Sequence, residues 1–306
     1  MLGAIAGDFV GSIHEYTAIK RKDFALVDPR CFVTDDSLLT VAVAEWVLDG
    51  TPLVPRFHDL VAAYPGAGWG LRFGSWARAR RTDPYHSFGN GAAMRVSPVG
   101  WAFAGLDDTL RAAAESAAVT HDHPEGIKGA QAAAAAVYLA RTTRDKALIR
   151  REIAHRFGYE LDRTVDVIRP TYKFDETCQR TVPEAVIAFL DGSDFEDTLR
   201  NAVSLGGDAD TLACIAGGIA HAYYGGVPEA LATPPRWRRS PAPCGGSGTA
   251  SALASLYPPD PAAWATQTYL TKRRLRTPKP LRLHPCSLSR SLGTLDAAKG
   301  SCWIAL

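Results

Sequence analysis

The chain of 306 residues has no apolar run long enough to cross a bilayer, which takes about 20 residues. Its first residues, MLGAIAGDFVGSIHE, lack a basic n-region and carry Asp8 within the apolar stretch, so we expect a helix of the mature protein rather than a signal peptide. The six cysteines form no C-x-x-C pair and no metal-knuckle spacing, which argues against a zinc site and a disulfide framework. These absences predict a cytoplasmic protein with no membrane partner.

Strand signals, meaning alternating β-branched runs closed by tight turns, are nearly absent up to about residue 230. Helical periodicity is present instead. Apolar residues within 39–47 recur at i, i+3, i+4, i+7 and i+8, a helix that Thr34 or Asp35 could cap and Gly50 could end. The sequence therefore predicts an all-α fold.

Capping residues and prolines predict where other helices begin. We expect helix starts at Asp107 or Asp108, at Pro124, at Pro183 and after Asp194. Two stretches, residues 64–100 and 157–182, show little helical periodicity. Long irregular segments of this kind in a compact domain usually line a site.

The last quarter of the sequence, residues 233–306, differs in composition from the rest. It holds eleven of the 34 Lys and Arg residues, two of the 32 acidic residues and ten of the 20 prolines. We predict two parts, a domain over residues 1–232 and a basic, proline-rich tail that is disordered. A nucleic-acid partner could be expected only through this tail, but we favour a linker or an artefact as the explanation of its composition.

Two acidic pairs lie at predicted helix starts, in VTDDSLLT (residues 33–40) and in GGDADT (residues 206–211). Either pair alone could be a helix cap. A calcium loop of the EF-hand type is excluded, because with Asp208 as the first position the sixth is Ala213 and the twelfth is Ile219, where such a loop needs Gly and Glu. Together, the two pairs and their threonines offer the all-oxygen ligand set that Mg²⁺ or Mn²⁺ prefers.

Five segments, in order along the chain, carry a resemblance to a known family. They are GAIAGDFVGSIHE, FVTDDSLLTVAVAE, SFGNGAAMRVSPVG, AAVTHDHPEGIKGAQAAAAAVYLA and SLGGDADTLACIAGGIAHAYYGGVPE. In these segments the sequence resembles the ADP-ribosylglycohydrolase family, up to about residue 230. Ser37 stands where a threonine is usual after T-D-D, and Ala209 where many relatives have serine; both changes leave the ligating groups in place.

The resemblance implies an all-α fold, a compact orthogonal bundle of many helices, around two Mg²⁺ or Mn²⁺ ions. The metal-binding positions match Thr34, Asp35, Asp36, Asp208, Asp210 and Thr211. The substrate-binding positions match Ser87, Gly89, Asn90, Gly91, Met94 and His121, of which the glycine loop would wrap the diphosphate and adenosine. Glu15 matches a position near the metals associated with substrate binding and catalysis, and Asp35 and Asp210 are the further candidates for catalysis.

The function that the resemblance implies is hydrolysis of the glycosidic bond between ADP-ribose and an acceptor, such as a modified protein side chain. Two alternatives stay open at this point. One is a two-metal phosphohydrolase that acts on a nucleotide or diphosphate, and the other is a non-catalytic ADP-ribose-binding relative. The sequence does not reveal the acceptor.

Overall fold

The structure is a computed structural model that describes residues 1–232. Its helices are α1 (Leu2–Gly11), α2 (Asp35–Asp49), α3 (Leu53–Ala63), α4 (Leu71–Arg78), α5 (Gly91–Met94), α6 (Ser97–Ala102), α7 (Leu106–Ala118), α8 (Pro124–Thr143), α9 (Lys146–Phe157), α10 (Val165–Ile168), α11 (Cys178–Asp191), α12 (Phe195–Ser204), α13 (Ala209–Tyr224) and α14 (Glu229–Ala232). Apart from one isolated bridge between Gly89 and Thr177, these residues contain no β-structure. The predicted all-α fold is confirmed. The tail predicted to be disordered, residues 233–306, lies outside the described residues.

Helix α2 begins and ends where the sequence predicts. Thr34 is its N-cap, and the Thr34 hydroxyl oxygen accepts the N–H of Asp36 at 3.2 Å. Gly50 ends the helix in the left-handed region, with φ of 81°, and its N–H donates to the carbonyl of Trp46. Both signals are local, because each depends on a few neighbouring residues.

Two other helix starts are also confirmed. Helix α8 begins at Pro124, and Asp194 caps α12 by accepting the N–H of Asp197 at 2.8 Å. Helix α7 begins at Leu106, so Asp107 and Asp108 lie in its first turn and do not cap it. There, their negative charges still interact favourably with the positive end of the helix dipole.

The prediction that Pro183 opens a helix is wrong, because α11 begins at Cys178 and Pro183 lies inside it. Contacts with a distant loop hold the additional turn. The N–H of Cys178 donates to the carbonyl of Phe88 at 3.0 Å, and its thiol donates to the carbonyl of Gly89 at 3.1 Å. Residues 64–100 also hold more helix than expected, namely α4, α5 and α6.

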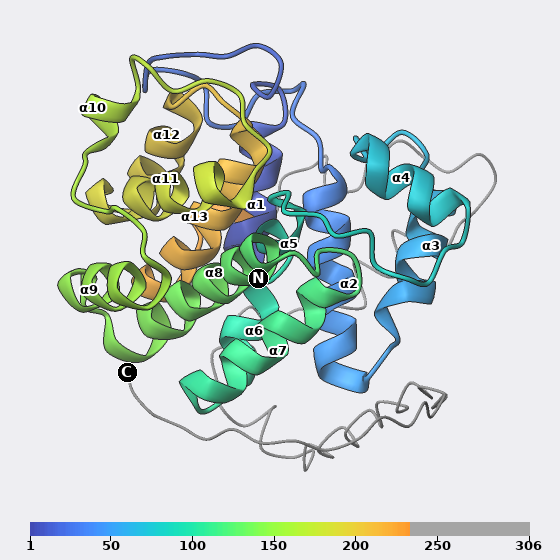
Figure 1. Cartoon of the computed structure of the whole chain (residues 1–306). Helices are drawn as coiled ribbons and strands as arrows, with labels where there is room; N and C mark the ends of the chain where they lie inside the picture. Colours follow the sequence, from blue (N-terminus) through green and yellow to red (C-terminus); the bar gives the residue numbers. More distant parts are fainter. Residues whose placement is uncertain (233–306) are drawn as a thin grey trace, which may run out of the picture. The chain divides into compact units, whose positions relative to one another are not determined.

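Helices α1 and α13 pack backbone against backbone (Figure 1). A β-carbon on Gly3, Gly7 or Gly11 would lie 2.2, 1.9 or 2.4 Å from a carbonyl oxygen of α13. Such distances exclude any side chain at these three positions. Because Gly11 lies against Ala209 and Asp210, the end of α1 is held at the beginning of α13.

Helix α13 lies among α1, α8, α11 and α12, all of which contact it (Figure 1). Every residue from Ala209 to Ala220 is buried. The acidic beginning of α13 is therefore placed in the interior, where an uncompensated carboxylate is costly. No helix in residues 1–232 is both long enough and apolar enough to cross a membrane.

Candidate metal centre and active site

The N-terminal ends of α2 and α13 meet, although they are far apart along the chain. The hydroxyl of Thr211 donates to Oδ1 of Asp36 at 3.4 Å, and the two residues are 3% and 2% exposed. Thr34 is buried beside Asp36, and Asp35, the first residue of α2, is partly buried. The acidic segments of residues 33–40 and 206–211 thus form one cluster.

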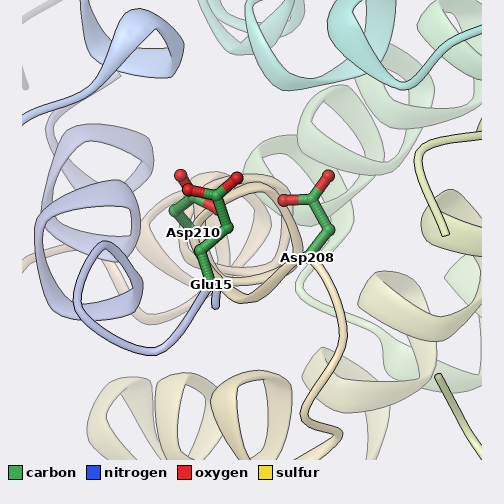
Figure 2. A group of neighbouring side chains, drawn as sticks. All are labelled: Glu15, Asp208 and Asp210. Atoms are coloured by element: carbon green, nitrogen blue, oxygen red, sulfur yellow. The ribbon is translucent and has the colours of Figure 1, made fainter. Parts of the chain in front are cut away.

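Glu15, Asp208 and Asp210 lie around the beginning of α13 and point to the same side (Figure 2). One carboxylate oxygen from each lies within 4.8 Å of those from the other two. Asp208 occupies the N-cap position of α13, but its carboxylate makes no capping hydrogen bond. Its Oδ2 instead accepts a hydrogen bond from the side-chain amide of Asn90 at 2.8 Å. Helix capping alone therefore does not explain the D-A-D spacing.

The cluster holds five carboxylates, those of Glu15, Asp35, Asp36, Asp208 and Asp210. Within residues 1–232 no Lys, Arg or His forms an ion pair with any of them. Burial, followed by repulsion from neighbouring carboxylates, raises the pKa of Asp35, Asp36 and Asp210 well above the usual range. Burial also raises the pKa of Glu15 to about 7. The cluster is a concentration of negative charge that the described part of the chain does not neutralise.

The donor atoms of the cluster suit a hard divalent cation. Oδ2 of Asp36 is buried and has no hydrogen-bond partner in the described structure. The other candidate ligands are carboxylate and hydroxyl oxygens, which Mg²⁺ and Mn²⁺ prefer to nitrogen or sulfur. A cation placed among these oxygens would satisfy the unpaired atom and offset the repulsion. The residues present therefore fit a metal.

The loop before α5 is tied to this cluster through Asn90. While its amide contacts Asp208, its backbone N–H donates to the carbonyl of Glu176 at 2.7 Å. Within the loop, the hydroxyl oxygen of Ser87 accepts the N–H of Gly89 at 3.1 Å. The loop predicted to bind substrate is thus fixed at one edge of the acidic cluster.

His121 faces the two glycines of this loop. A β-carbon on Gly89 or Gly91 would lie 3.6 or 3.2 Å from Nε2 of His121. The ring is 4% exposed, and its other nitrogen, Nδ1, lies 2.7 Å from the hydroxyl oxygen of Thr120. The structure therefore brings the predicted histidine and the predicted loop together.

Met94 lies at the end of α5 and is 4% exposed. Its sulfur is 4.0 Å from the hydroxyl of Thr211, and its carbonyl accepts hydrogen bonds from Thr40 and Cys214, each at 3.3 Å. Like Asn90, which bonds to Asp208, Met94 is a predicted substrate-binding residue that contacts a predicted metal ligand.

The sequence model of the ADP-ribosylglycohydrolase family matches residues 1–256. The chain belongs to this family. Among curated proteins, ADP-ribosylhydrolase ARH3 of Mus musculus is 26% identical over 313 residues, covering 75% of this chain and 84% of the mouse protein. ARH3 of Homo sapiens is also 26% identical and covers 75% of this chain and 86% of the human protein. A solved structure described as an ADP-ribosylglycohydrolase-related protein complex superposes with a TM-score of 0.58 at 25% identity, covering 78% of this chain and 90% of that one.

These findings confirm the family inferred from the five sequence segments and the enzyme class, a glycosidic hydrolase. In this ADP-ribosylglycohydrolase the family model extends past residue 232, the domain boundary that composition predicts. That boundary and the roles of individual site residues stay predictions.

Sequence reasoning missed Asp8, which the ADP-ribosylglycohydrolase buries completely in the middle of α1. Its carboxylate accepts the N–H and hydroxyl of Thr34, at 3.0 and 2.7 Å, and also the N–H and hydroxyl of Ser37. Asp8 thereby fixes the first turn of α2, which carries three predicted metal ligands. A lone acidic residue inside the apolar stretch GAIAGDFVG was the available signal.

Proposed function

We propose that this ADP-ribosylglycohydrolase hydrolyses the N- or O-glycosidic bond between C1″ of ADP-ribose and an acceptor, with a modified protein side chain as the acceptor class. The observation that carries the proposal is the meeting of the two acidic helix starts with Glu15 and with the loop that contains Asn90. The names of the ARH3 relatives support ADP-ribose as the group recognised.

We propose two Mg²⁺ or Mn²⁺ ions as the resident cofactors. The residues that would hold them are Thr34, Asp35, Asp36, Asp208, Asp210 and Thr211. Such ions, when bound, supply Lewis-acid polarisation of sugar hydroxyls and make a water molecule more acidic. The unpaired Oδ2 of Asp36 and the lack of any neutralising side chain in residues 1–232 support this assignment.

Glu15 is proposed as the general acid or base, and Asp35 and Asp210 as the other catalytic carboxylates. Glu15 is only partly buried and follows α1 in a turn, so its carboxylate can reach both the cluster and an incoming substrate. Glycoside hydrolysis needs a group that moves a proton while positive charge builds on the sugar ring. A carboxylate at the edge of the cluster meets both needs.

Binding of the diphosphate and adenosine of ADP-ribose is assigned to the loop before α5 and to the histidine that faces it. The residues are Ser87, Gly89, Asn90, Gly91, Met94 and His121. Glycines allow backbone N–H groups to approach phosphate oxygens closely. Asn90 links this loop to Asp208. Through that link, the position of the diphosphate would be set relative to the cluster beneath the distal ribose.

The products of the reaction test the proposal directly. We expect the full-length chain with Mg²⁺ or Mn²⁺ to release intact ADP-ribose from peptides ADP-ribosylated on arginine or serine, as detected by mass spectrometry. Glu15→Gln serves as a low-activity comparison. Release of AMP or phosphate would identify a phosphohydrolase instead, and tight binding of ADP-ribose without turnover on any conjugate would indicate a binding protein.

The role of Asp8 leads to a second expectation. Asp8→Asn puts an amide where the carboxylate accepts four hydrogen bonds, so the first turn of α2 loses its fixed position. Affinity for Mg²⁺ should fall about 10- to 100-fold, as for other residues that orient metal ligands. Calorimetric titration with Mg²⁺ measures this change. Asp194→Asn, at the cap of α12, is the matched control and should bind Mg²⁺ as the wild type does. Unchanged affinity in a folded Asp8→Asn protein would refute the role.

A cytoplasmic location is proposed for this enzyme. In the described residues Cys31, Cys178 and Cys214 are buried free thiols, as a reducing compartment allows. A contact with nucleic acid would rest on the basic tail, which lies outside those residues.

A further inference from the structure

Arg95 is a buried cation for which residues 1–232 offer no carboxylate partner. It is 0% exposed, and its guanidinium carbon lies 4.9 Å from the ring centre of Phe57. Its Nη2 donates to the carbonyl of Ser116 and to the hydroxyl oxygen of Thr120, both at 2.9 Å, while Nε and Nη1 have no partner in the described structure. A buried, incompletely bonded charge is destabilising, so its retention calls for an explanation.

The contact with Thr120 leads from Arg95 to His121. Thr120 is 0% exposed, and its oxygen lies between Nη2 of Arg95 and Nδ1 of His121, at 2.9 and 2.7 Å. Arg95 can only donate, so the Thr120 oxygen accepts from it. The Thr120 proton has one neighbouring acceptor in residues 1–232, namely Nδ1 of His121. If Nδ1 instead carried the proton and donated to the Thr120 oxygen, the buried Thr120 hydroxyl proton would have no acceptor in residues 1–232.

These bonds select one neutral form of the imidazole. Because Nδ1 accepts from Thr120, the proton of the neutral ring resides on Nε2. Burial, followed by the charges of Arg95 and Arg72, lowers the pKa of His121 well below its usual value, so the ring is neutral at physiological pH. Nε2 is the ring nitrogen that faces Gly89 and Gly91. The loop therefore receives a fixed N–H donor.

We propose that Arg95 and Thr120 are positioning residues that hold His121 in the Nε2–H form, so that it donates a hydrogen bond to a phosphate oxygen of ADP-ribose in the Ser87–Gly91 loop. The identity of the ligand rests on the proposed function, whereas the tautomer of His121 follows from the hydrogen bonds alone. Arg95 does not touch the ligand. It polarises the Thr120 hydroxyl, and the positive charge acts on the anion through the chain of hydrogen bonds.

The experiment uses the full-length protein labelled with ¹⁵N-histidine. Long-range ¹H–¹⁵N spectra distinguish the two neutral forms, and His121→Gln identifies the signal of His121. The wild type should carry its proton on Nε2. Thr120→Val should lose this preference and bind ADP-ribose with Mg²⁺ about 10-fold more weakly by calorimetry, the size of one lost hydrogen bond. Mg²⁺ affinity measured without ADP-ribose should not change.

Two variants control for packing. Thr120→Ser keeps the hydroxyl and should retain both the Nε2–H form and the affinity. Ser116→Ala removes a nearby buried hydroxyl whose one partner within residues 1–232 is the carbonyl of Ala113, and it should behave as the wild type. If Thr120→Val does not fold, Thr120→Ala replaces it.

A proton on Nδ1 in the wild type would overturn the proposal. So would a Thr120→Val protein with altered tautomer and unaltered affinity for ADP-ribose, or one with neither altered. Failure of the proposed function looks different, because the wild type itself would then not bind ADP-ribose, whereas the tautomer measurement would still give its result.

Discussion

Changing Asp210 to Asn is expected to lower turnover roughly 10³-fold or more while raising the melting temperature of the metal-free protein by about 2–4 °C. Asp210 is 4% exposed, and burial together with Asp208 and Asp36 makes its ionised form unfavourable. Asparagine keeps the shape and can still accept the N–H of Thr211, which Oδ1 of Asp210 accepts at 3.0 Å. It removes one negative charge, so repulsion within the cluster falls while a cation loses an anionic ligand.

Opposite changes in stability and activity are what distinguish a metal ligand from a residue that supports the fold. Differential scanning fluorimetry in a chelator, calorimetric titration with Mg²⁺ and the ADP-ribose release assay measure the three quantities. Asp107→Asn removes the same charge from an exposed site in the first turn of α7 and should leave turnover and Mg²⁺ affinity unchanged. An Asp210→Asn enzyme that binds Mg²⁺ and turns over like the wild type would contradict the proposed centre.

The features of the fold that could be predicted are those determined by neighbouring residues. Thr34 and Gly50 delimit α2 through a cap and a left-handed glycine, and Pro124 opens α8, as the sequence indicates. The helix start predicted at Pro183 is wrong because the first turn of α11 is held by Phe88 and Gly89, which lie far away in the sequence. A local pattern contains no information about such a contact.

The meeting of α2 and α13 likewise depends on tertiary packing. It was expected from the family resemblance, but its cause is the glycine face of α1. Gly11 allows α1 to end against Ala209 and Asp210, and Asp8, one turn earlier, bonds to the start of α2. Helix α1 therefore connects both acidic helix starts, a role that composition and periodicity do not reveal.

Divalent cations are expected to raise the melting temperature by roughly 5–10 °C near pH 8, because ligand at 100 times its dissociation constant contributes about 2.7 kcal/mol and a domain of this size gains about 2–4 °C per kcal/mol. Part of this gain is relief of the repulsion among the carboxylates. The gain should therefore depend on pH, since protons neutralise the same groups that the cation neutralises.

The direction of that dependence follows from the raised pKa values. Carboxyl groups in an unfolded chain titrate near pH ~4, whereas burial raises the pKa of Asp8 to about 6 and that of Glu15 to about 7, with Asp35, Asp36 and Asp210 shifted in the same direction. A carboxyl group with a raised folded-state pKa gives stability that is complete below the unfolded value and is lost as pH rises through the folded value. In a chelator, stability should thus fall between about pH 4 and about pH 7.

The difference between melting temperatures with Mg²⁺ and with a chelator isolates this effect, because titrating groups elsewhere in the protein contribute equally to both. The difference should be small near pH 5 and approach its full value near pH 8. Asp210→Asn should show a smaller difference and a flatter curve, since one of the repelling charges is gone. A wild-type difference that is the same at both pH values would mean that the cation binds elsewhere than among the buried carboxylates, and the assignment of the centre to the meeting of α2 and α13 would then fail.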